Sequence, residues 1–156
     1  MTETMTPQTA PRWWWEDFPV GRTMEFGAMP VTREAVLAFA REFDPQPFHL
    51  DDEAAGASLF GRLCASGWHT AAMAMRMMCD GYLLDSASLG SPGIDELRWL
   101  APVYPGDTLS TGFEVVAARR MPMPDSKTLR RQTMRRLFPA GVVVAFLLTV
   151  PVVNLL

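Results

Sequence analysis

The sequence predicts one α+β domain in which a buried helix lies on an antiparallel sheet. Three observations predict this fold class. Arg33–Phe43 carries apolar residues at helical spacing, Gly67–Leu84 is apolar on nearly all sides, and several strand-like segments follow it. With 156 residues, 49% of them hydrophobic and 20% charged, the chain is large and apolar enough to bury one core.

The amino-terminal part predicts a short leader and then a strand. Met1–Arg12 is polar and rich in Thr and Pro, so we expect a mobile leader ahead of a single domain at 13–156. The leader lacks the apolar stretch of a secretory signal, and we therefore expect a cytoplasmic protein. Thr23–Val31 is the first predicted strand.

The first helix has clear start and stop signals. Thr32 is a good N-cap for Arg33–Phe43, and Pro45 disfavours a helical backbone at Asp44. A loop is expected after this helix. Two further helices, a partial one and a long buried one, are expected at Ala54–Phe60 and Gly67–Leu84, and the later strands are expected at Ile94–Pro102, Thr108–Arg119, Thr128–Phe138 and Val142–Val153.

The carboxyl-terminal segment allows two interpretations. Leu137–Leu156 has 20 uncharged residues, which is long enough to cross a bilayer, and basic residues precede it. Its prolines and its many valines equally suit one or two buried strands. We prefer the strands and expect no membrane association, with a tail anchor as the alternative.

Composition excludes some function classes. Fourteen Lys and Arg stand against 17 Asp and Glu, a net charge of −3, which argues against a nucleic-acid binder. Two cysteines and two histidines are too few for a disulfide scaffold and leave little material for a metal centre. We therefore expect neither a metal nor a cofactor.

One short stretch carries candidate chemistry. Asp44 and His49 bracket a loop with two prolines, each of which fixes a backbone dihedral. A carboxylate and an imidazole held in this way can share one water or substrate proton, as acid–base catalysis requires. The alternative is that Asp44 only forms a turn and that backbone groups satisfy His49.

Three motifs together carry a family resemblance. They are Asp44-Pro-Gln-Pro-Phe-His49 with Ala55, Phe60-Gly61-Arg62 leading to Ala65-Ser66-Gly67-Trp68, and Leu97–Leu109. In this order they resemble the MaoC-like dehydratase family, which includes the (R)-specific enoyl-CoA hydratases. The resemblance covers about residues 23 to 118 and implies a hotdog fold, a long helix wrapped by an antiparallel sheet, which dimerises with active sites at or near the interface.

The resemblance also implies roles for residues of this chain. It implies that Asp44 and His49 form the catalytic pair and that the Gly67 N–H is the oxyanion donor. A helix amino terminus suits that last role independently, because its N–H groups are unpaired and its dipole end is positive. The side chains expected to contact substrate are those of Phe48, Ser66, Trp68 and His69, although His69 also suits a structural place in the first helical turn.

The implied reaction is addition of water to a trans-2-enoyl thioester, or its removal from a 3-hydroxyacyl thioester, as in fatty acid metabolism. The expected partners are an acyl-CoA or acyl carrier protein thioester and a second copy of the chain. One alternative is a hotdog thioesterase, which the position of Asp44 disfavours because thioesterases generally carry their carboxylate on the central helix. The other is a non-catalytic acyl-binding or assembly subunit.

Overall fold

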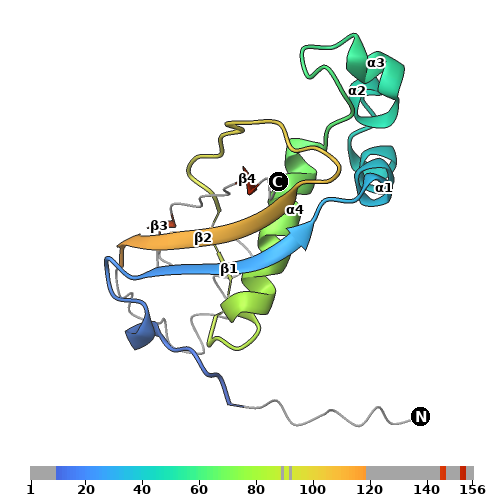
Figure 1. The fold of residues 1–156 in the computed structure, drawn as a ribbon. Helices are drawn as coiled ribbons and strands as arrows, with labels where there is room; N and C mark the ends of the chain where they lie inside the picture. Colours follow the sequence, from blue (N-terminus) through green and yellow to red (C-terminus); the bar gives the residue numbers. More distant parts are fainter. Residues whose placement is uncertain (1–9, 89, 92, 119–144, 147–151, 154–156) are drawn as a thin grey trace, which may run out of the picture.

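The structure, a computed structural model, describes residues 10–88, 90–91, 93–118, 145–146 and 152–153. Figure 1 shows the elements in chain order. The helical elements are η1 (Trp15–Asp17), α1 (Arg33–Phe43), α2 (Pro47–Leu50), α3 (Asp52–Gly56), α4 (Gly67–Met78) and the π-helical turn η2 (Cys79–Leu83). The strands are β1 (Thr23–Pro30), β2 (Thr108–Ala117), β3 (Ala145–Phe146) and β4 (Val152–Val153).

The strands form one antiparallel sheet centred on β2. Strand β1 pairs with one edge of β2, from Thr23 opposite Glu114 to Pro30 opposite Thr108. Strands β3 and β4 pair antiparallel with β2 as well, beside its ends (Figure 1). Both short strands lie within 142–153, so the strand interpretation of the tail is confirmed at the four residues that the structure describes there. Within the described part of the chain, no helix is both long enough and apolar enough to cross a bilayer.

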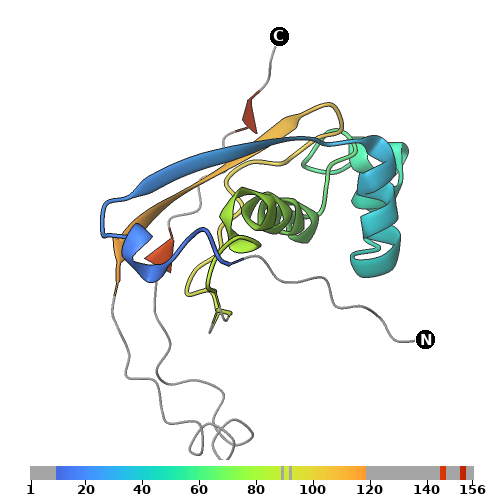
Figure 2. The same cartoon turned by 90° about the horizontal axis from the view of Figure 1, so that it is seen from below.

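Helix α4 packs against one face of this sheet, which curves over it (Figure 2). The side chains of Met73 and Met77 on α4 meet the fully buried Leu109 of β2 in the main core cluster. A second cluster forms at η2, where Tyr82 packs with Phe113 and Val115 of β2. The predicted α+β class, with a helix on an antiparallel sheet, is confirmed, but α4 is buried on one side only, since Met75 is 49% exposed.

Local signals account for the bounds of the helices. Thr32 Oγ1 accepts a hydrogen bond from Ala35 N at 3.2 Å, and α1 spans the predicted residues. Helix α4 begins at the predicted Gly67, and the helical path continues through η2 to one residue before the predicted end. Helix α3 begins earlier than expected, because the Asp51 carboxylate accepts from Ala54 N at 2.9 Å and caps it. It also ends earlier, at Gly56 instead of Phe60.

Two predictions are wrong. The chain after Asp44 does not remain a loop, since Pro47–Leu50 forms one helical turn with a proline at its start. Residues 94–102 form no strand but an irregular exposed segment, in which Ile94 is 72% and Leu100 is 90% exposed. Strand-like composition needs a neighbouring strand, and the described residues supply none there. The predictions for Met1–Thr9 and Thr128–Phe138 lie outside the described residues.

Candidate active site

Helices α1 and α2 hold Asp44 and His49 on either side of a short connection. Asp44 ends α1, with its backbone N–H donating to the carbonyl of Ala40 at 3.0 Å. Gln46 holds the Asp44 side chain from the same loop, because its Nε2 donates to Oδ1 at 2.8 Å. His49 follows on α2, which packs against α1 and α3. The sequence-predicted pair therefore lies at the end of α1 and on α2.

The carboxylate of Asp44 and the imidazole of His49 face each other. Oδ2 of Asp44 lies 3.5 Å from Nε2 of His49, and the two side chains are 18% and 7% exposed. On the far side of the ring, Nδ1–H donates to the carbonyl oxygen of Cys64 at 2.8 Å. Because a carbonyl oxygen only accepts, Nδ1 carries a proton, and Nε2 is the ring nitrogen that faces Asp44.

Ser66 joins this pair to the start of α4. Its Oγ donates to Asp44 Oδ2 at 2.6 Å and accepts from the backbone N–H of Trp68 at 3.2 Å, so one buried hydroxyl caps the helix and holds the carboxylate. The hydrogen bond from Ser66 lowers the pKa of Asp44, with smaller contributions from Gln46 and His49, while burial of the carboxyl opposes the shift. Asp44 is held as an anion beside the helix amino terminus.

Gly67 is the first residue of α4 and follows Ser66 directly. The N–H groups of the first helical turn have no acceptor within the helix, and the positive end of the helix dipole lies there. An amide donor thus lies next in sequence to the serine that binds Asp44. An oxyanion near this helix start would gain both an N–H donor and the helix dipole.

The other sequence-predicted site residues differ in burial and in the side chains that they contact. Phe48 is half-buried, and its ring packs against His49 at 4.5 Å and Phe60 at 5.2 Å between centroids. Trp68 is 61% exposed beside Gly67. His69 is buried and stacks on Phe39 at 4.8 Å, and burial lowers its pKa. Among the described residues nothing hydrogen-bonds to His69 Nδ1.

One important contact of this site has no signal in the sequence. The acceptor for His49 is the backbone carbonyl of Cys64, and every residue has such a carbonyl. Only the path of the chain into α4 brings it against the imidazole. In the described ranges, no group of three His, Cys, Asp or Glu side chains is placed to hold a metal ion.

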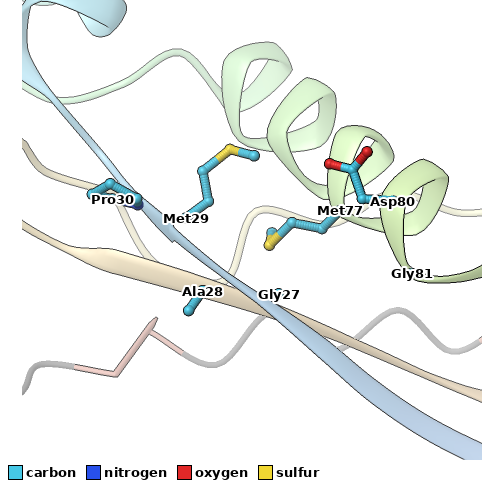
Figure 3. Close-up of a pocket in the computed structure, with 7 residues that line it drawn as sticks. All are labelled: Gly27, Ala28, Met29, Pro30, Met77, Asp80 and Gly81. Carbon is cyan, nitrogen blue, oxygen red and sulfur yellow. The ribbon is translucent and has the colours of Figure 1, made fainter.

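A cavity of about 410 Å³ lies elsewhere, between β1 and the carboxyl-terminal end of α4 (Figure 3). The side chains of Met29 and Met77 project into the space between the strand and the helix, and Asp80 lies at its helical side. Met77 is ten residues after Gly67 on the helix, about 15 Å of helix rise. The cavity is therefore not part of the site around Asp44 and His49.

Comparison with known proteins gives one consistent result. Residues 17–134 match the family described as MaoC like domain. The uncharacterized protein YdeM of Bacillus subtilis (strain 168) is 31% identical over 102 residues, which are 65% of this chain and 72% of that protein.

Two solved structures share the fold with substantial sequence identity. A MaoC-like dehydratase from Rhodospirillum rubrum is 38% identical with a TM-score of 0.62, and the match covers 88% of this chain and 84% of that one. An (R)-hydratase from A. caviae, described as involved in PHA biosynthesis, is 27% identical with a TM-score of 0.53 and coverages of 67% and 77%. The resemblance and the hotdog fold that it implied are confirmed: the chain belongs to the MaoC-like domain family.

Proposed function

We propose that this chain is an acyl-thioester hydratase or dehydratase of the enoyl-CoA hydratase type. The observation that carries the proposal is the 3.5 Å separation of Asp44 Oδ2 from His49 Nε2. At this distance one water can reach both atoms, and both accept its protons when Asp44 is ionised and His49 is neutral. The arrangement suits activation of a single water.

The reaction follows from the groups around that water. The thioester carbonyl oxygen accepts from the Gly67 N–H, which draws electrons from the conjugated double bond and makes the β-carbon electrophilic. One member of the pair takes a proton from water while the water oxygen bonds to the β-carbon. The electrons of the double bond move to the α-carbon and the carbonyl oxygen. The Asp44–His49 pair then delivers a proton to the α-carbon, which balances the proton taken from water and completes the 3-hydroxyacyl thioester. Dehydration is the same path in reverse.

Ser66 has a positioning role in this scheme. Ser66 is only 1% exposed, and its hydroxyl already donates to Asp44 and accepts from Trp68 N. It therefore acts by orienting the Asp44 carboxylate and not by contact with the substrate. Trp68 is the exposed side chain nearest in sequence to the Gly67 amide, and we assign it to contact with the bound thioester. Phe48 supports the imidazole by an edge contact at 4.5 Å, which helps to fix the direction of Nε2.

The comparisons support the reaction class. Membership of the MaoC-like domain family and the likeness to an (R)-hydratase both point to addition or removal of water. A thioester of coenzyme A is the substrate form that we assign, with the chain acting as a dimer. A second copy would cover exposed apolar side chains such as Trp99 and Leu100.

A single assay tests the proposal. Purified protein is mixed with crotonyl-CoA, and the loss of the enoyl-thioester absorbance is followed together with the release of free thiol. We expect absorbance loss without thiol release, and formation of 3-hydroxybutyryl-CoA by chromatography. Thiol release would instead identify a thioesterase, and binding without turnover of crotonyl-CoA or longer enoyl-CoA esters would identify a binding subunit.

A further inference from the structure

The indole of Trp99 lies directly against Gly67, although 32 positions separate the two residues in the sequence. A Cβ added at Gly67 would lie 2.6 Å from Cε2, 2.8 Å from Cδ2 and 2.9 Å from Nε1 of Trp99. Cδ2 and Cε2 are the two atoms shared by the indole rings, so the contact is centred on the ring system. No side chain at position 67 could coexist with this contact unless the indole moved.

The indole of Trp68 also contacts the indole of Trp99. The two tryptophan rings meet nearly at right angles, with centroids 5.9 Å apart and planes 78° apart. This edge-to-face arrangement is a favoured geometry for aromatic pairs. Trp99 is 50% exposed even so, which is unusual for a large apolar side chain that only fills a core.

The contact lies at the functional end of α4. Gly67 supplies the amide that follows Ser66, and Ser66 binds the carboxylate of Asp44 at 2.6 Å. A ring face against the Gly67 Cα restricts movement of this first helical turn. It also removes water from one side of the amide, and a hydrogen bond to an oxyanion is stronger where water is excluded.

We propose that Trp99 is a positioning residue for the Gly67 amide, an inference that rests on the proposed hydratase function. The indole fixes the direction of the N–H toward the thioester oxygen and shields it on one side. This role belongs to the step in which charge develops on that oxygen. Loss of Trp99 should therefore lower kcat more than it raises KM.

The experiment compares four single variants and one double variant with the wild type, on crotonyl-CoA. Trp99→Ala should lower kcat by about 10²-fold, the effect expected when a donor is misplaced by about 1 Å, with KM changed less than about threefold. Trp99→Phe keeps an aromatic face and should restore most of kcat. Leu59→Ala is the control, because this apolar side chain is 90% exposed in a different segment, and it should keep wild-type kcat.

Gly67→Ala tests the contact itself. Alone it should lower kcat, because the new Cβ meets the indole, whereas in the Trp99→Ala background it should cost little further activity. Circular dichroism of each variant shows that the fold is retained.

The outcomes separate this inference from the proposed function. A wild-type chain with no hydration activity would refute the proposed function and the role of Trp99 with it. An active wild type with full kcat in Trp99→Ala would refute the positioning role alone. The positioning role would also be refuted if the kcat losses of Gly67→Ala and Trp99→Ala multiplied in the double variant. A Trp99→Ala variant that changed only KM would refute it as well.

Discussion

The hydroxyl of Ser66 donates a 2.6 Å hydrogen bond to the carboxylate of Asp44, which is 22 positions earlier in the chain. The same hydroxyl accepts from Trp68 N and caps α4. One buried oxygen thus joins the helix that carries Gly67 to the end of the helix that carries Asp44.

Ser66→Ala should move the acid limb of the kcat/KM profile to higher pH. The folded pKa of Asp44 lies below its ordinary value, mainly because of the Ser66 hydrogen bond, so the variant raises it. A depressed carboxyl pKa contributes stability above the unfolded pKa, and this contribution is lost as pH falls through the folded pKa. In the variant, stability at neutral pH falls, and protonation of Asp44 begins at a higher pH.

Thr32→Ala is the matched control for this prediction. Thr32 caps α1 through Ala35 N, as Ser66 caps α4, but it belongs to the other end of α1 from Asp44. Both variants should lose about 0.5–2 kcal/mol of stability through the missing cap. Only Ser66→Ala should shift the acid limb, and an equal shift in both would contradict the prediction.

Asp44 and His49 should behave as one unit in catalysis. Asp44→Asn removes the charge but keeps the shape, and His49→Ala removes the imidazole. Each should lower kcat on an enoyl-CoA by about 10²- to 10⁴-fold, and the double variant should be scarcely worse than either. The measurement is steady-state hydration of crotonyl-CoA.

Asp51→Asn is the control for charge loss. Asp51 caps α3 with its carboxylate, and asparagine is an equally good cap, so this variant should keep its activity. Full activity in Asp44→Asn would contradict the hydratase assignment.

Gly27→Ala should destabilise the fold more than Gly21→Ala. Both glycines have positive φ, +80° and +85°, where alanine costs about 1–2 kcal/mol. A Cβ at Gly27 would also lie 2.4 Å from Met77 Sδ, whereas at Gly21 nothing lies within 4 Å. Overpacking should add about 1–3 kcal/mol at Gly27. Urea denaturation of the two variants measures the difference, and equal losses would show that Met77 moves aside freely.

The chain should be a dimer of 17.4 kDa subunits in light scattering. Ile94, Leu97, Trp99 and Leu100 are all exposed within one short segment that has no strand partner among the described residues. Leu100→Glu should therefore shift the mass toward the monomer. Leu59→Glu is the control, because Leu59 is equally exposed in a different segment. A monomer in the wild type at micromolar concentration would refute the prediction.

Local sequence signals were enough to predict several elements. Helix α1 is defined by signals close together in the chain, which are its helical apolar spacing, the Thr32 cap and Pro45. Its predicted bounds are those found in the structure. The start of α4 at Gly67 was equally clear. The apolar tail was correctly interpreted as strand at 145–146 and 152–153. Asp44 and His49 could be named because only four residues, two of them prolines, separate them.

Tertiary structure alone decided the contacts that complete the site. The orientation of the His49 ring depends on the Cys64 carbonyl, the pKa of Asp44 depends on Ser66, and the surroundings of Gly67 depend on Trp99. These contacts join residues 15 to 32 positions apart, and no local periodicity or cap encodes them. Residues 94–102 make the same point for the fold, because a strand-like sequence becomes a strand only where another strand lies beside it.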